Sequence, residues 1–264
     1  DWSDFRIMGV LQRISLAYVL SALLIIRFNF KQMLQILTGI LLFYWALLWL
    51  GSKQGPFEIE SNFARTFDIL ILGENHLYRG FGIPFDPEGI LSTIPSLGTV
   101  IIGYLMGGML HTTKNYNDCV KRMFVFGFGL IVIGYLWGFI FPINKALWTS
   151  SYVLFTGGIA TIFLSVITYL IDIKHFKKPF WVFEVFGTNS IFIFILSGLW
   201  VKTIINIKRE LNGEMTSAYN YLYKTIFVPL AGDVNGSLLF AITHVVGFWL
   251  ILYWMYRKKI QIKL

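Results

Sequence analysis

The sequence predicts an all-α membrane protein, a polytopic bundle of about seven transmembrane helices. Of its 264 residues, 56% are hydrophobic and 14% are charged, and the mean hydropathy is +0.66. A soluble domain of this length could not bury so much apolar surface in one core. Seven segments stay apolar for the roughly 20 residues that a helix needs to cross a bilayer. The ten-residue alternation typical of a membrane β-barrel does not occur in the sequence.

We expect a single transmembrane domain over residues 1–264, which would be the C-terminal part of a larger bundle. The spans are predicted near residues 7–26, 32–50, 94–110, 123–141, 148–171, 180–205 and 238–256. Two long loops, 52–93 and 206–237, separate some of these spans. Loops longer than about 15 residues seldom act only as connectors, so both are candidates for function.

The distribution of lysine and arginine predicts the orientation in the membrane. The segments 27–31, 111–122, 172–179 and 257–264 are short, yet they hold 12 of the 22 basic residues. Such an excess is typical of the cytoplasmic side. The segments on the other side hold 11 of the 14 acidic residues. We therefore expect a cytoplasmic C-terminus and extracytoplasmic long loops. A bacterial cytoplasmic membrane is expected, since the basic tail and the lack of any disulfide pair fit it at least as well as a lysosome.

Two neighbouring polar residues, Gln12 and Arg13, interrupt the first apolar segment. Arg13 lies about six residues past the outer end of the span, or roughly 9 Å into the hydrocarbon. An unpaired charge at that depth costs at least a few kcal/mol, so the guanidinium is expected to face the bundle interior. It is either a structural anchor that reaches outward or a wall of a polar cavity.

Other polar residues also fall inside predicted spans. His244 enters the last span from the outer side, whereas Glu184, Asn189 and Ser190 enter the sixth from the cytoplasmic side. Together with Arg13 they predict a polar path through the bundle. A single buried histidine is more often a satisfied core residue than a catalyst, and this alternative stays open for His244.

The outer loops carry groups suited to a polar substrate. His76, Asp86 and Glu88 precede the third span, and Asn144, Lys145 and Trp148 precede the fifth. Carboxylates, an amide and an indole suit a sugar, since hydroxyls need donors and acceptors while the ring can cover an apolar face. The alternative is structural, because Asp86-Pro87-Glu88-Gly89 is also a plausible tight turn before a helix.

The sequence offers few signals for other chemistry. No metal-ligand spacing or phosphate-binding glycine loop is evident, and the four histidines fall on both predicted faces of the membrane. We expect no metal and no nucleic-acid partner. The short basic loops are expected to bind anionic membrane lipid, or alternatively an anionic cytosolic cofactor.

Five ordered stretches, RIMGVLQRISLAY, FDPEGILSTIPS, INKALWTSSYVLFTGG, GTNSIFIF and YRKKI, resemble the membrane acetyltransferases related to heparan-alpha-glucosaminide N-acetyltransferase and their bacterial relatives. The resemblance runs over nearly all of the chain. It implies that acetyl-CoA donates an acetyl group from the cytosol and that an amino sugar or another sugar receives it on the far side. Arg13 and its neighbours would then line the acetyl path.

The resemblance also implies a missing part. In this family the histidine held to be catalytic precedes the VLQR block, and no histidine of this chain matches it. The catalytic residue is therefore unknown. We expect the 264-residue segment alone to be inactive, although the parent protein would be an enzyme. A homo-oligomer is one expected form of that enzyme. The alternative is a secondary transporter for a small polar solute, with Arg13, Glu184 and His244 as its substrate or coupling site.

Overall fold

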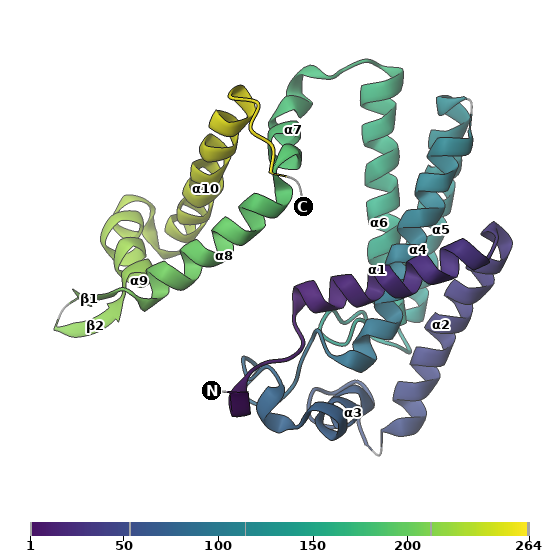
Figure 1. Cartoon of the computed structure of the whole chain (residues 1–264), viewed down its shortest axis with the longest axis horizontal. Helices are drawn as coiled ribbons and strands as arrows, with labels where there is room; N and C mark the ends of the chain where they lie inside the picture. The colour runs from purple at the N-terminus through teal and green to yellow at the C-terminus, as the bar shows by residue number, and fades with distance from the viewer. Residues whose placement is uncertain (1, 53, 114, 212, 263–264) are drawn as a thin grey trace. The chain divides into compact units, whose positions relative to one another are not determined.

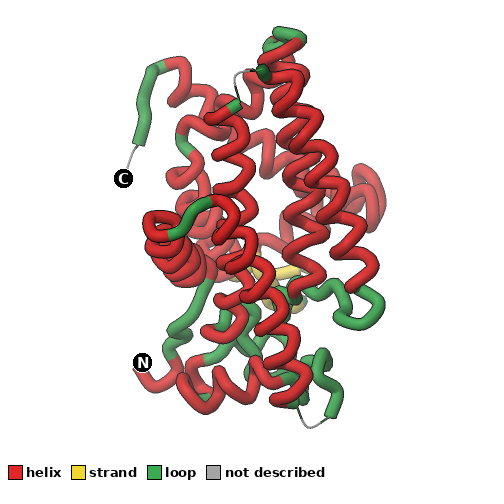
Figure 2. The backbone as a smooth tube through the Cα atoms, turned by 90° about the vertical axis from the view of Figure 1, so that its right-hand side faces the viewer, coloured by secondary structure: helices red, strands yellow, loops and turns green. Residues whose placement is uncertain are grey.

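The structure, a computed structural model, describes residues 2–52, 54–113, 115–211 and 213–262 (Figure 1). It divides into two compact units, Asp1–His175 and Phe176–Leu264. Figure 2 shows that helices make up most of the backbone. Each unit is described below by itself.

The first unit is a bundle of helices with one short helix in an outer loop. A 3₁₀ turn at Trp2–Asp4 precedes the bundle. Its helices are α1 (Val10–Arg27), α2 (Phe30–Gly51), α3 (Phe63–Leu72), α4 (Ile90–Thr112), α5 (Tyr116–Trp137) and α6 (Ser150–Thr168). A 3₁₀ turn, Glu74–His76, follows α3, and a π-helical turn, Tyr169–Ile173, extends α6.

Polar caps divide the first apolar stretch into two helices. Asn29 accepts a hydrogen bond from the Gln32 backbone N–H, and the Gln32 side chain accepts one from the Asn29 N–H. This capping box satisfies two backbone donors that would otherwise lack a partner at the start of α2. The chain therefore ends α1 at Arg27 and begins a new helix at Phe30.

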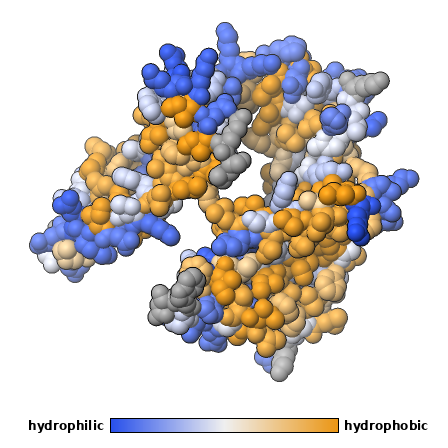
Figure 3. All heavy atoms as spheres, viewed as in Figure 1, coloured by the Kyte–Doolittle hydropathy of each residue, from blue (hydrophilic) through white to orange (hydrophobic). Residues whose placement is uncertain are grey.

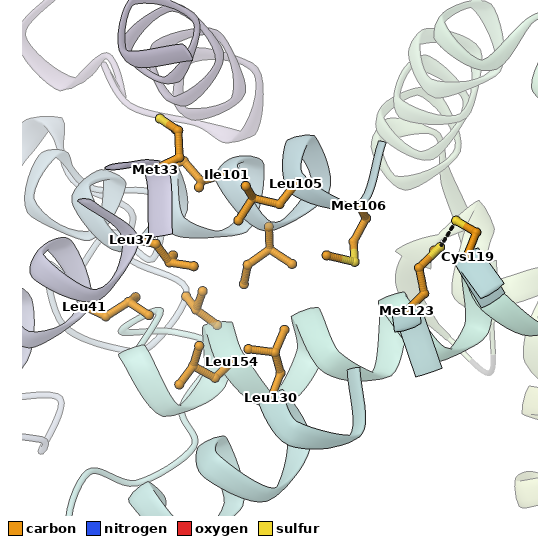
Figure 4. Close-up of a cluster of buried hydrophobic side chains, with 12 residues drawn as sticks. Met33, Leu37, Leu41, Ile101, Leu105, Met106, Cys119, Met123, Leu130 and Leu154 are labelled. Carbon is orange, nitrogen blue, oxygen red and sulfur yellow. Dashed lines mark hydrogen bonds between the residues drawn. The ribbon is translucent and has the colours of Figure 1, made fainter. Parts of the chain in front are cut away.

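Helix α4 is the most buried of the candidate spans in the described chain. It contacts α1, α2 and α6. Figure 4 shows side chains of α2, α4, α5 and α6 meeting in the apolar core. The core residues include Met33, Leu37, Leu41, Ile101, Leu105, Met123 and Leu154. This packing holds the middle of α4, whereas Leu91 in its first turn belongs to a second buried cluster with Tyr44 and Phe85.

Helices α5 and α6 approach closely through glycine. A Cβ added at Gly127 would lie 2.9 Å from the Gly158 carbonyl oxygen, and one at Gly134 would lie 2.5 Å from the Phe155 nitrogen. Small residues allow the backbones of membrane helices to come this close. The pair forms a rigid support beside α4.

The second unit combines helices with a small β-hairpin. After a 3₁₀ turn, Lys178–Phe180, its elements are α7 (Trp181–Thr188), α8 (Ser190–Asn206), β1 (Lys208–Leu211), β2 (Glu214–Ser217), α9 (Ala218–Leu222), a π-helical turn (Tyr223–Phe227) and α10 (Val228–Arg257). The strands pair antiparallel, with Lys208 opposite Ser217. Val185, Leu252 and Met255 form its buried core.

The described residues contain six helices that are long and apolar enough to cross a membrane, or up to seven if one bent pair counts as a span. This confirms the predicted all-α polytopic membrane fold. Figure 3 shows extensive hydrophobic surface on these helices, as expected for contact with lipid.

Two predicted segments differ from the structure. The sixth span, 180–205, is broken into α7 and α8, which are bent by 68° at Asn189. Asparagine favours such breaks because its side chain competes for backbone hydrogen bonds. The outer loop 206–237 is largely ordered secondary structure, and α10 begins at Val228 rather than near 238. Gly232, with φ +75°, kinks α10 at a conformation that glycine adopts without strain.

Candidate functional site

The Arg13 side chain lies inside the first unit and is only 5% exposed. Its Nη1 donates to the Pro87 carbonyl oxygen and its Nη2 to the Ser92 carbonyl oxygen, both at 2.9 Å. The guanidinium carbon lies 4.1 Å from the centroid of the Trp148 ring. The Nε atom is buried and has no hydrogen-bond partner among the described residues.

The helical period explains why Arg13 is buried while Gln12 is exposed. Arg13, Ala17 and Ser21 recur every four residues and are all buried, so they form one stripe along α1. This stripe faces α4, which α1 contacts. Gln12 points away from it and is exposed. The structure therefore separates the two residues that the sequence places side by side.

The carbonyl groups that hold Arg13 belong to the entry of α4. The Gly89 N–H bonds to the Asp86 carbonyl at 3.1 Å, which closes the turn before the helix. The Pro87 carbonyl lies outside the helix and has no helical N–H to accept, so it is available to the guanidinium and to the Ser92 hydroxyl, 3.0 Å away. The predicted tight turn is present and forms one wall of the site.

Arg6 fastens this turn from the segment before α1. Its Nε and Nη2 donate to the two carboxylate oxygens of Asp86 at 2.9 and 2.7 Å, and Nη2 also donates to Glu88 at 2.6 Å. The hydrogen bond to Asp86 is the main cause that raises the pKa of Arg6 above its ordinary value. The guanidinium carbon also lies 4.7 Å from the Tyr78 ring centroid. One fork-shaped cation thus binds two carboxylates.

Asp68 lies beneath the same turn, where it caps α4. It comes from α3, is 1% exposed, and its Oδ1 accepts from the Leu91 N–H at 3.2 Å. Burial raises the pKa of Asp68 to about 7, although this hydrogen bond opposes the shift. A Cβ at Gly89 would collide with the Asp68 carboxylate, so glycine is required there for the cap to form.

A cavity of about 390 Å³ opens beside Arg13; we call it the Arg13 pocket. The polar and aromatic groups that line it are Arg13, Tyr18, Glu88, Ser96, Thr99, Lys145 and Trp148, and the apolar ones are Val10, Ile14, Ala17 and Val100. The Trp148 indole N–H donates to the Thr99 hydroxyl at 3.3 Å. The side chains around the pocket thus include two cations, a carboxylate, hydroxyls and two aromatic rings.

Four predicted site residues meet in this pocket, namely Arg13, Glu88, Lys145 and Trp148. The other predicted outer residues have structural contacts instead. Asp86 is buried under Arg6, and the His76 ring Nδ1 lies 2.8 Å from the Phe5 carbonyl oxygen. Asn144 accepts the Ala146 and Leu147 N–H groups and so shapes the turn before α6. These residues hold the walls of the pocket in position.

The remaining predicted residues belong to the second unit. Glu184 is exposed and accepts a hydrogen bond from the Tyr256 hydroxyl at 3.2 Å. Asn189 is buried, and Ser190 is exposed at the start of α8. The His244 Nδ1 lies 2.9 Å from the Phe240 carbonyl oxygen. This contact agrees with the alternative in which His244 is a buried histidine with a hydrogen-bond partner.

His244 also lines a largely apolar cavity of about 410 Å³, together with Trp200, Phe240 and Phe248. Its ring lies edge-on to Phe240, with centroids 4.4 Å apart. An imidazole surrounded by aromatic rings in this way can serve a structural role by packing against them. Both cavities have mostly apolar surfaces, and they differ in that charged side chains line the Arg13 pocket.

Sequence reasoning missed Arg6, Asp68, Ser96 and Thr99. The available signal for Asp68 was an acidic residue within the apolar run FDILIL of α3. The partners of Arg6 lie 80 and 82 residues away, so no local pattern predicts them. Within the described residues, no group of three or more His, Cys, Asp or Glu side chains could hold a metal ion.

The fold and the Arg13 pocket define an integral membrane protein with a pocket in its first unit that two cations line. Over 150 residues, the chain is 31% identical to heparan-alpha-glucosaminide N-acetyltransferase of Mus musculus and equally to that of Homo sapiens. Each alignment takes in 50% of this chain and 22% of the relative, so the chain spans about a fifth of the curated relatives that it matches. A search of family models found no match.

Proposed function

We propose that the chain is part of a transmembrane acetyltransferase that moves an acetyl group from cytosolic acetyl-CoA to an amino sugar or another sugar on the extracytoplasmic side. The observation that carries this proposal is the buried Arg13 guanidinium, whose Nε has no partner among the described residues, beside a pocket lined by charged side chains. The similarity to N-acetyltransferases supports the reaction class. Membrane lipid and the sugar are the partners that this function requires.

The groups of the Arg13 pocket suit a sugar acceptor. Glu88 accepts hydrogen bonds, whereas Lys145 and Arg13 donate them, so sugar hydroxyls could be bound in both senses. Trp148 adds an aromatic surface, one face of which is covered by the guanidinium. The pocket volume of about 390 Å³ lies within the range of small-molecule sites.

Arg13 has a further role in this proposal. Transfer to an amine forms a C–N bond at the acetyl carbonyl carbon and breaks the C–S bond of the thioester, and negative charge gathers on the carbonyl oxygen. A fixed cationic donor stabilises such charge best when little water is present. The Nε–H of Arg13 is a donor that has no partner among the described residues.

The test uses the full-length protein that contains this chain, reconstituted in proteoliposomes. Labelled acetyl-CoA is supplied on one side and glucosamine on the other, and labelled N-acetylglucosamine is measured. Arg13→Gln should lower turnover at least about 100-fold, as loss of an oxyanion donor does, whereas Arg27→Gln at the end of α1 should not. Normal turnover by Arg13→Gln would overturn the assignment.

One observation favours a secondary transporter as the second candidate. The pair α7 and α8 is bent by 68° at Asn189, and discontinuous helices are common at transporter binding sites. The same vesicles separate the two functions. Accumulation of unmodified glucosamine without acetyl-CoA would favour the transporter, whereas acetylated product that depends on acetyl-CoA would favour the enzyme.

The sidedness is part of the proposal. We place the C-terminus in the cytoplasm and the loops 52–93 and 206–237 outside, in a bacterial cytoplasmic membrane. The basic short segments support this arrangement. Protease or thiol labelling at Gln261 and at Glu58 from each side of sealed vesicles checks it.

A further inference from the structure

We infer that the C-terminal tail of the second unit forms a binding site for a phosphate group. A cavity of about 430 Å³ lies between the end of α7 and the end of α10; we call it the tail pocket. Its lining consists of Thr188, Tyr256, Arg257, Lys259, Ile260 and Gln261. This set contains two cations, two hydroxyls and an amide, and no carboxylate among the described residues. The site is independent of the Arg13 pocket and of the proposed function.

The end of α10 turns the chain back to form one wall. The Lys259 N–H donates to the Tyr256 carbonyl and the Ile260 N–H to the Met255 carbonyl, both at 3.0 Å. This pair of bonds is a Schellman motif, which normally has glycine at its left-handed position. Lys259 occupies that position with φ +57°. A lysine is thus held in a conformation for which glycine is the better residue.

Asn189 fixes the returning tail. It is 1% exposed, and its Nδ2 donates to the Ile260 carbonyl at 3.0 Å. Its Oδ1 accepts from the Ile262 N–H at 2.8 Å. Both halves of one buried amide therefore bind the tail, and the wall of the pocket is an ordered structure. The break between α7 and α8 places Asn189 where it can do this.

Among the described residues, no carboxylate forms an ion pair with the cations of the tail pocket. Both salt bridges in the described part of the chain involve Arg6, so neither Arg257 nor Lys259 forms one. The nearby carboxylate of Glu184 instead accepts from the Tyr256 hydroxyl. In Figure 3, hydrophilic residues gather over the end of α10. A guanidinium and an ammonium beside hydroxyl and amide groups are the donors that phosphate oxygens prefer.

The phosphate could belong to an anionic lipid headgroup or to a soluble phosphate ester, and the experiment separates these sources. The full-length protein is placed in nanodiscs of phosphatidylcholine, and its thermal midpoint is followed during titration with inorganic phosphate at constant ionic strength. A second series replaces part of the lipid with phosphatidylglycerol. A rise in the first series supports a soluble source, and a rise in the second alone supports a lipid source.

Two variants with matched charge identify the site. Arg257→Gln/Lys259→Gln should lower the apparent affinity at least tenfold. Lys208→Gln/Arg209→Gln removes the same charge from the exposed strand β1 and should leave it unchanged. Equal losses in both variants, or no midpoint rise in either lipid series, would overturn the inference.

A further variant separates binding from folding. Lys259→Gly should raise the thermal midpoint without ligand, because glycine adopts positive φ without a Cβ penalty. The same variant should bind phosphate several-fold more weakly than the native protein. Retention of native affinity by this better-folded variant would show that Lys259 takes no part in binding and would contradict the site.

Discussion

The Arg13 guanidinium stacks on the Trp148 ring at 4.1 Å while it donates to the Pro87 and Ser92 carbonyl groups. A residue of α1 thereby contacts both the first turns of α4 and Trp148, which lies two residues before α6. The charge is bound entirely by neutral groups. This arrangement lets a cation remain inside the bundle, where a pocket borders it.

The stacking predicts energetic coupling between Arg13 and Trp148. Trp148→Leu should destabilise the protein by about 0.5–2 kcal/mol through loss of the cation–π contact. Arg13→Lys should cost about 1–3 kcal/mol, because a lysine cannot reproduce the planar fork to two carbonyl groups. In a double-mutant cycle of thermal unfolding, the two losses should not add. Trp49→Leu, at a tryptophan that is 54% exposed, is the control; full additivity at Trp148 would contradict the contact.

Asp68 predicts a pH dependence of stability. Its folded pKa of about 7 is above the ordinary value of 3.8, so between these values the folded state holds a proton that the unfolded state has released. Stability should therefore fall as the pH rises from about 4 to 7 and then level off. Asp68→Asn should flatten this part of the midpoint profile, whereas Asp172→Asn, at an exposed aspartate, should not. A profile unchanged by Asp68→Asn would refute the assignment.

Arg6 should stabilise the entry of α4 mainly by neutralising Asp86. The Asp86 side chain is fully buried, whereas the Arg6 side chain is 35% exposed. Arg6→Gln should cost about 1–3 kcal/mol because it leaves a buried carboxylate without its cation. Adding Asp86→Asn should recover part of that loss. Arg79→Gln, which removes an exposed hydrogen bond to Asn75, is the comparison and should change stability little.

Substitution by alanine should change stability in opposite directions at Gly89, just before α4, and at Gly103, within α4. Gly89→Ala should destabilise by about 1–3 kcal/mol, because the new Cβ would displace the Asp68 carboxylate from its cap. Gly103→Ala, within α4, has nothing within 4 Å of the new Cβ and should stabilise the helix by up to about 1 kcal/mol. Thermal unfolding in one detergent compares them. A neutral Gly89→Ala would show that Asp68 does not occupy this position.

The sequence predicts the fold class because long apolar segments are stable in lipid. It predicts the inward position of Arg13 because exposing a charged group to lipid costs free energy. It also brings Glu88, Lys145 and Trp148 into the site, since all three lie at predicted outer ends of spans. The clamp by Arg6 depends on a partner 80 residues away, which no local period encodes. Likewise, the broken sixth span depends on Asn189 binding the tail more than 70 residues later.

Asp86 and His76 are predicted as groups that meet a substrate, and in the structure both contact the protein itself. A carboxylate before a helix can bind a ligand or satisfy the protein itself, and the sequence is identical in both cases. The structure gives the Asp86 oxygens to Arg6 and to the Glu88 N–H. Whether these residues also act on an acceptor stays a prediction.

The most direct test of the Arg13 pocket is its accessibility to water. In a Cys119→Ser background, Thr99→Cys would line the pocket, and Phe43→Cys on the exposed face of α2 would lie at a similar depth, about 12–14 Å from the outer helix ends. We expect a charged, membrane-impermeant thiol reagent to label Thr99→Cys from the outer side and to leave Phe43→Cys unlabelled. An unreactive Thr99→Cys, in a protein that still folds, would contradict a polar pocket at Arg13.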